Sequence, residues 1–135
     1  EGMWQILQQD DADDFVLATG ETHSVREFVE VAFSCVGIEI GWTGNGAGEK
    51  GVVLSIDAEK MAQQVGSDNF SVKVNDVLVG LSESYLRPTE VDLLIGDASK
   101  ARHTFGWTPR TGFGELVKIM IDADCAEMRG PGSHF

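Results

Sequence analysis

The segment from Ser24 to Gly37 constrains the fold more than any other part of the sequence. It opens with a capping box, in which the Ser24 hydroxyl accepts from the backbone N–H of Glu27 and the Glu27 carboxylate reaches back. Gly37 is typical of a helix end. We therefore expect an amphipathic helix over 24–36. The apolar residues that recur at helical spacing behind the cap are Val25, Phe28, Val29 and Ala32.

Apolar runs on both sides of this helix predict an α/β fold. Short runs bounded by turn residues predict strands at 15–18, 38–43, within 52–56 and within 70–74. Helical spacing predicts further helices at 1–9, 97–105 and 112–128, and one or two helical turns at 57–64, so about three to four helices pack with the short strands. We place Asp97 at the N-cap of one helix, and Gly106 at its end. The last helix carries an apolar face made of Leu116, Ile119, Met120 and Ala123.

The composition limits the kinds of protein that this chain can be. Its 135 residues, 42% of them apolar, suit one ordinary domain with a real core and not a disordered acidic tail. With 10 Lys and Arg against 22 Asp and Glu, the net charge is −12. This charge argues against a nucleic-acid surface, which needs a basic stripe. An anionic ligand must therefore be bound locally, by a few well-placed cations.

The cysteines and the chain ends give further expectations. Cys35 and Cys125 lie far apart in apolar stretches, so we interpret them as two buried structural thiols in a reducing, cytoplasmic setting. There is no run of about 18 apolar residues, so we expect no membrane span. The chain opens inside an expected helix and without an initiator methionine, which suggests a piece of something longer. Residues 130–135 are expected to be a disordered tail.

A search for catalytic or metal-binding constellations assigns no residue. His23, His103 and His134 are not at metal-ligand spacing with another histidine or with a cysteine. The glycine-rich stretch 44–48 lacks the spacing of a dinucleotide-binding motif, so we interpret it as a loop. Tyr85, the only tyrosine, has no lysine four residues later. No catalytic, cofactor-binding or metal-binding residue is therefore predicted.

Arg26 is the first of two notable arginines. It lies in the first turn of the expected helix over 24–36, where the helix dipole favours anions. It is thus unfavourable there unless it pairs with an anion, and together with the free backbone amides it would suit a phosphate. The alternative is an exposed arginine paired with Glu27 or Glu30, and the residues alone favour this alternative.

Arg87 is the second notable arginine. It precedes Pro88, which restricts the backbone and so presents a planar guanidinium that suits bidentate phosphate binding. Glu90 follows three residues later and could accept from sugar hydroxyls. The alternative, at least as common, is a structural ion pair of Arg87 with Glu90 or Asp92.

Several segments together resemble the GDP-mannose 4,6-dehydratase family. The most specific are Ala-Thr-Gly-Glu-Thr-His-Ser-Val-Arg-Glu-Phe from Ala18 and Arg-Pro-Thr-Glu-Val-Asp from Arg87. A Gly-Trp-Thr-Pro run at Gly106 and the stretch from Glu115 to Asp124 extend the likeness. The resemblance covers roughly 1–43 and 85–129.

The resemblance implies the C-terminal substrate-binding portion of an extended short-chain dehydrogenase/reductase. Such enzymes, which are lyases of deoxysugar biosynthesis, convert GDP-D-mannose to GDP-4-keto-6-deoxy-D-mannose with NADP. An N-terminal Rossmann domain holds the cofactor and the catalytic Ser/Thr, Tyr and Lys, so an isolated fragment would bind no cofactor and be inactive. The full-length enzyme would form homo-oligomers. By resemblance, Arg87 contacts the diphosphate of GDP-mannose, Glu90 its ribose, and Arg26 its phosphate or sugar.

The stretch 49–84 departs from the resemblance and looks like an atypical insertion in a domain that otherwise covers 1–135. A second hypothesis is a stand-alone, non-catalytic module that binds a nucleotide sugar or a protein. The presence upstream of a Rossmann segment with its glycine motif and Tyr-x-x-x-Lys would distinguish the enzyme from the module.

Overall fold

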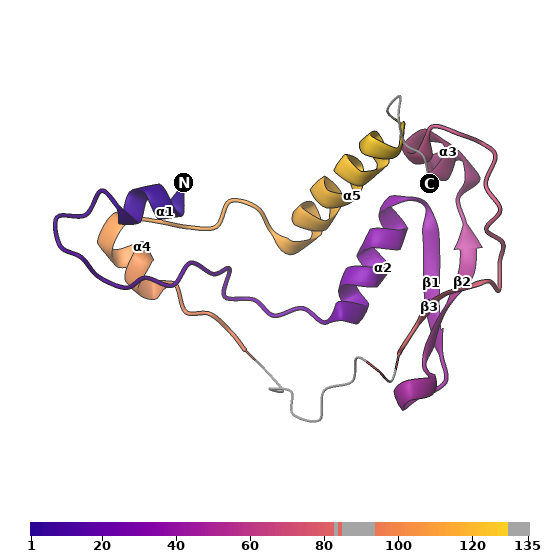
Figure 1. Cartoon of the computed structure of the whole chain (residues 1–135), viewed down its shortest axis with the longest axis horizontal. Coiled ribbons are helices and arrows are strands. Elements are labelled where there is room, and N and C mark those ends of the chain that lie inside the picture. Colours follow the sequence, from indigo (N-terminus) through magenta and orange to yellow (C-terminus); the bar gives the residue numbers. More distant parts are fainter. Residues whose placement is uncertain (83, 85–93, 130–135) are drawn as a thin grey trace. The chain divides into compact units, whose positions relative to one another are not determined.

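The computed structural model describes residues 1–82, 84 and 94–129. The chain divides into two compact units (Figure 1). Unit 1 comprises Glu1–His23 and Thr89–Phe113, and unit 2 comprises Ser24–Pro88 and Gly114–Phe135. The described helices and strands confirm the predicted α/β class. No helix in the described ranges is long and apolar enough to cross a membrane.

Unit 2 contains a three-stranded antiparallel sheet. Its strands are β1 (Ile38–Thr43), β2 (Lys50–Ile56) and β3 (Val77–Gly80), in the order β1-β2-β3. β1 and β2 agree with the predicted strands at 38–43 and 52–56. Between them the glycine-rich stretch forms a tight turn with a short 3-10 helix, η1 (Gly46–Gly48). This turn brings the start of β2 directly opposite the end of β1, with Lys50 paired to Thr43.

Two capped helices flank the first strands. α2 (Val25–Cys35) begins at the predicted capping box and ends before Gly37, whose φ of 82° is in the left-handed region. α3 (Ala58–Val65) has Asp57 at its N-cap and the left-handed Gly66 at its C-cap. Both predicted helices are therefore confirmed, because each carries its own start and stop signals. α2 runs alongside β1, as Figure 1 shows.

The core of unit 2 forms where these elements meet. It consists of Ile38 and Ile40 of β1, Val53 of β2 and Met61 of α3. Val53 is completely buried. Partly buried apolar side chains close the core around these four: Phe33, Val36, Trp42, Ile56, Val65, Phe70 and Val72.

The predicted strand within 70–74 is wrong. Phe70 and Val72 do pack on the core, but the chain turns at Lys73 and the ladder begins only at Val77. In this turn Asp76 accepts from the backbone N–H of Lys73 at 2.8 Å, and Asn75 is left-handed with a φ of 75°. Asparagine tolerates this conformation better than most residues, so the turn ends the apolar run early.

α5 (Phe113–Arg129) confirms the predicted last helix. The side of the helix that is buried differs from the predicted apolar face. Leu116, Ile119 and Met120 are each between 44 and 52% exposed. The buried residues are Val117 and Cys125, which lie eight residues apart on one helix face. Both cysteines are free, but only Cys125 is buried as predicted, whereas Cys35 is partly exposed. Burial raises the pKa of the Cys125 thiol.

Unit 1 is built from two short helices and extended chain. α1 (Gly2–Ile6) is shorter than the predicted helix over 1–9, and Trp4 on it is 64% exposed. α4 (Ser99–Phe105) ends at the left-handed Gly106, as predicted. Its N-cap is Ala98 rather than Asp97, but the Asp97 carboxylate accepts from the backbone N–H and the hydroxyl of Ser99. Asp97 thus performs the capping role from one residue upstream.

The predicted buried strand at 15–18 is also wrong: the described residues of unit 1 contain no strand. Phe15 packs edge-on against Phe105 of α4, with ring centroids 5.0 Å apart. Ala18 lies so close to Gly96 that no side chain would fit there. Val16 is 52% exposed. The run is extended, but its side chains pack on a helix and on a neighbouring loop without a backbone ladder.

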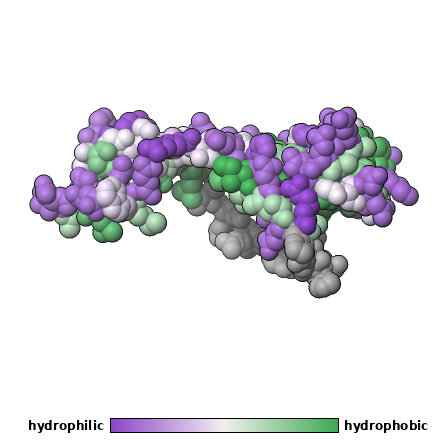
Figure 2. Space-filling view, turned by 90° about the horizontal axis from the view of Figure 1, so that it is seen from above, coloured by the Kyte–Doolittle hydropathy of each residue, from purple (hydrophilic) through white to green (hydrophobic). Residues whose placement is uncertain are grey.

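The surface agrees with the acidic, polar composition. In Figure 2 hydrophilic residues predominate on the visible face, with apolar residues scattered between them. Several large apolar side chains are more than three-quarters exposed, among them Met3, Leu7 and Val25.

Candidate functional site

The first candidate, Arg26, is held at a well-defined helix start in unit 2. Both halves of the capping box are formed: Glu27 N–H donates to Ser24 Oγ at 3.1 Å, and Ser24 N–H donates to Glu27 Oε2 at 2.7 Å. The cap fixes the backbone of the first helical turn. The sequence therefore determines where the Arg26 side chain leaves the helix.

Arg26 forms an ion pair that the sequence did not suggest. Its Nη2 donates to Glu49 Oε1 at 2.5 Å, across 23 positions of the chain. The Arg26 side chain is 49% exposed and that of Glu49 is 20% exposed. Of the two carboxylates that the sequence suggests as partners, Glu30 accepts from the indole N–H of Trp42, and Glu27 forms the capping box with Ser24. An acidic side chain thus compensates the cation at the helix N-terminus, as the helix dipole requires.

Trp42 supports the same guanidinium from another side. Arg26 Cζ lies 4.9 Å from the centroid of the Trp42 ring, within the range of a cation–π contact. The indole N–H of Trp42 in turn donates to Glu30 Oε1 at 2.7 Å. α2 therefore provides both the arginine and the carboxylate that fixes the ring beside it. We call Arg26, Glu30, Trp42 and Glu49 the arginine cluster.

The half-exposed guanidinium of the arginine cluster has the chemical character that suits an anion. Arginine presents a planar fork of donors that matches a carboxylate or phosphate, and stacking on an aromatic ring leaves that fork free to bond. Glu49 already accepts from one donor nitrogen of this fork, Nη2. Sequence reasoning missed Trp42 and Glu49, since neither lies near Arg26 in the chain; the glycine-rich turn before Glu49 was the only local sign of a tight approach.

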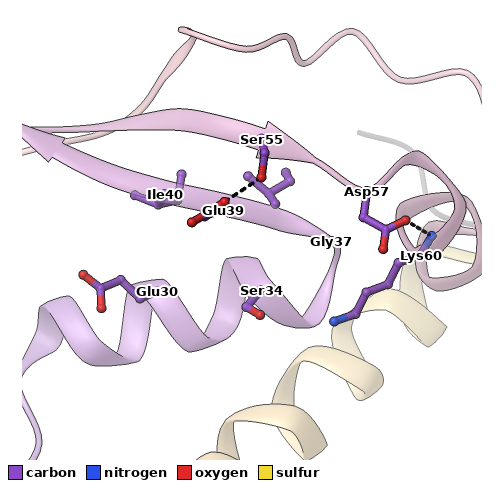
Figure 3. A pocket seen from close by; sticks show the side chains of 9 residues that line it. Glu30, Ser34, Gly37, Glu39, Ile40, Ser55, Asp57 and Lys60 are labelled. Atoms are coloured by element: carbon purple, nitrogen blue, oxygen red, sulfur yellow. Dashed lines mark hydrogen bonds between the residues drawn. The ribbon is translucent and has the colours of Figure 1, made fainter.

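A pocket of about 510 Å³ lies beside the cluster in the same unit (Figure 3). Its charged lining residues are three carboxylates, Glu30, Glu39 and Asp57, and one amine, Lys60. Glu39 accepts from the Ser55 hydroxyl at 2.7 Å and Asp57 from the backbone N–H of Lys60 at 3.0 Å. This excess of negative charge repels phosphates, so the pocket itself is not suited to an anionic ligand.

The other two candidates, Arg87 and Glu90, lie outside the described residues. Their expected approach to a common ligand with Arg26 therefore stays a prediction. His134 lies outside as well, whereas His23 stacks on Phe113 with ring centroids 3.8 Å apart and bonds to Glu21 at 3.3 Å. Within the described ranges no three His, Cys, Asp or Glu side chains are grouped so as to hold a metal ion.

Unit 1 contains a second cation beside an aromatic ring. Lys100 Nζ lies 5.0 Å from the Phe15 centroid and pairs with Asp13 at 2.6 Å. Hydrogen bonding from Lys100 lowers the pKa of the Asp13 carboxyl, with the Asp14 backbone N–H adding to the effect. Both side chains are about half exposed, 50% for Lys100 and 52% for Asp13. This is an ordinary surface ion pair with a ring beneath it.

Comparison with known proteins supplies the family context. The family model described as GDP-mannose 4,6 dehydratase matches residues 1–120. The GDP-mannose 4,6 dehydratase of Drosophila melanogaster is 46% identical over 129 residues, which are 96% of this chain and 28% of that protein. The proteins of that name from Dictyostelium discoideum and Vibrio cholerae are 45% and 40% identical, over 92% and 93% of this chain and 30% and 29% of their own. The chain therefore spans less than a third of these relatives.

Proposed function

The chain belongs to the GDP-mannose 4,6-dehydratase family, and from this premise we propose that it is the GDP-sugar-binding part of such an enzyme. The reaction of the complete protein is the conversion of GDP-D-mannose to GDP-4-keto-6-deoxy-D-mannose. The observation that carries this proposal is the family match over 1–120 of a chain that corresponds to under a third of its relatives.

The ligand contacts in the proposal come from three side chains. Arg26 binds a phosphate or the sugar, and its support is the half-exposed guanidinium held over Trp42 at a fixed helix start. Arg87 binds the diphosphate, because the proline after it restricts the backbone that carries its guanidinium. Glu90 accepts from the ribose hydroxyls. The diphosphate is the charged part of the ligand, so the two arginines provide most of its electrostatic binding.

The chemical step belongs to other parts of the enzyme in this proposal. The catalytic Ser/Thr, Tyr and Lys, and NADP with them, lie in a Rossmann domain outside this sequence. The pocket of unit 2 has three carboxylates against one amine, a lining that would repel the dinucleotide phosphates. The isolated chain is accordingly inactive. The complete enzyme is cytoplasmic and forms homo-oligomers.

The direct test is a dehydratase assay with GDP-mannose and NADP on the complete protein that contains this chain. We expect formation of the 4-keto-6-deoxy sugar by the complete protein and none by the chain of 135 residues alone. A complete protein without turnover, or without an upstream glycine motif and Tyr-x-x-x-Lys, would favour the non-catalytic module instead.

A binding experiment tests the assigned contacts. Arg87→Ala in the complete protein should weaken GDP-mannose binding by about 1.5–3 kcal/mol, the scale of a hydrogen bond to a charged group. Isothermal titration calorimetry gives the affinity directly. Arg110→Ala is a suitable control, because Arg110 is 77% exposed and pairs with Glu1 in unit 1. Equal affinities for Arg87→Ala and wild type would reject the role of Arg87.

A further inference from the structure

The carboxylate of Glu49 bonds one of the donor nitrogens through which an anionic ligand of Arg26 would bind. It bonds Nη2 of Arg26 at 2.5 Å, on a guanidinium that is half exposed. A phosphate and a carboxylate bind the arginine fork in the same geometry. A ligand phosphate that takes this position must therefore displace Glu49 or share the guanidinium with it.

Glu49 lies where its side chain can leave without disturbing the fold. It follows the turn that joins β1 to β2, and β2 begins at the next residue, Lys50. The turn itself is tight: Gly44 has a φ of 82°, and a side chain on it would come within 2.6 Å of the Gly48 carbonyl oxygen. Because the sheet and the turn fix the backbone, exchange requires only a rotation of the Glu49 side chain.

Trp42 keeps the guanidinium in place when Glu49 leaves. Its contact with Arg26, at 4.9 Å from the ring centroid, does not involve Glu49. The ring is itself held by the indole N–H bond to Glu30, at 2.7 Å. The plane of the guanidinium therefore has a support from α2 and β1 that is common to both states.

We propose that Glu49 is an internal competitor for Arg26, which it releases to a ligand diphosphate, and that Trp42 is the positioning residue that holds Arg26 during this exchange. This inference rests on the proposed function, in which Arg26 binds the ligand. Its consequence is selectivity: only a ligand that offers Arg26 a stronger anion than a carboxylate recovers the lost ion pair. A neutral sugar does not, whereas a nucleoside diphosphate does.

The test is calorimetric titration of the complete protein with GDP. Glu49→Gln removes the competing charge, so GDP should bind about two- to fivefold more tightly, the range expected for a partly exposed ion pair. Asp13→Asn is the matched control, because Asp13 also pairs with a cation that lies over an aromatic ring. It changes the net charge equally and should leave the affinity for GDP unchanged.

Two further variants separate the failure of this inference from failure of the proposed function. Arg26→Ala should weaken GDP binding and abolish the gain from Glu49→Gln in the double variant. If Arg26→Ala leaves GDP binding unchanged, the proposed contact itself is wrong. If Arg26→Ala weakens binding but Glu49→Gln does not tighten it beyond Asp13→Asn, Glu49 is no competitor.

The positioning role of Trp42 is tested by comparing an aromatic with an aliphatic replacement. Trp42→Phe keeps an aromatic face for Arg26, whereas Trp42→Leu removes it. Trp42→Leu should weaken GDP binding, and Trp42→Phe should restore most of the loss at equal thermal stability of the two variants. Equal GDP affinity of both variants would show that the ring does not position Arg26.

Discussion

The arginine cluster of unit 2 and the Lys100 ion pair of unit 1 contain the same kinds of contact, but the ring and the carboxylate are held more firmly in unit 2. In each, a cation lies about 5 Å from an aromatic centroid, 4.9 Å for Arg26 and 5.0 Å for Lys100, and bonds a carboxylate. In unit 2 the ring is hydrogen-bonded to Glu30, and the carboxylate is 20% exposed. In unit 1 the ring is a phenyl, and the carboxylate is 52% exposed.

The difference follows from the apolar side chains that each unit buries. Unit 2 has a sheet and a core of four buried side chains, so the residues around Arg26 are attached to rigid elements. Among the described residues of unit 1, the buried apolar side chains are those of the two alanines Ala98 and Ala101. A cation on such a unit is an ordinary surface charge, whereas a cation on unit 2 can be held ready for a ligand.

The largest expected effect tests whether the core of unit 2 supports the site. Val53→Ala removes two methyl groups from a completely buried position, so we expect a loss of about 2–3 kcal/mol in the free energy of unfolding. Leu54→Ala on the same strand is the control, since Leu54 is 54% exposed. Urea unfolding measures both. A similar loss for the two variants would mean that the described core does not carry the stability of unit 2.

The next effect concerns the helix start that presents Arg26. Ser24→Ala removes the acceptor for the Glu27 N–H and should cost about 1 kcal/mol of stability. Ser34→Ala in the same helix should be neutral or slightly stabilising, because alanine has the higher helix propensity. Thermal unfolding of both variants distinguishes capping from a general effect of serine loss. An unchanged melting temperature for Ser24→Ala would contradict the role of the cap.

The smallest effect is a pH dependence in unit 1. Hydrogen bonds from the hydroxyl and then from the backbone N–H of Ser99 lower the pKa of Asp97 from its usual 3.8. The folded pKa is depressed, so Asp97 stabilises the start of α4 above pH 3.8, and this contribution is lost as the pH falls through the folded value. Amide hydrogen exchange of α4 should therefore accelerate in acid for the wild type. Asp97→Asn should remove this acid dependence, and an identical profile in the variant would refute it.

Local signals explain which parts of the fold could be predicted from the sequence. The capping box at Ser24 and the glycines after α2 and α4 each mark a helix boundary within a few residues of chain. β1 was recognisable because Ile38 and Ile40 alternate with polar residues. Each of these elements could be predicted without knowing which other elements it packs against.

The incorrect predictions concern segments whose structure depends on contacts with distant parts of the chain. The run at 15–18 is apolar enough for a strand, but Phe15 packs on α4 and the run forms no ladder in the described residues. On α5 apolar residues occur on more than one side, so the sequence could not show that Val117 and Cys125 are the buried ones. In the site, Arg26 could be singled out from the sequence because a cation is unfavourable at a helix start. Glu49 and Trp42 could not, because they come close to Arg26 only when β1 and the turn after it are folded.

Calorimetric titration of GDP-mannose into Arg26→Ala and Lys100→Ala variants of the complete protein tests the central comparison most directly. Arg26→Ala should weaken binding by about 1.5 kcal/mol, roughly tenfold in Kd, because the ligand loses a charge-assisted contact. Lys100→Ala removes the same charge from unit 1 and should leave the affinity unchanged. Equal affinities for the two variants would contradict the assignment of ligand binding to the arginine cluster.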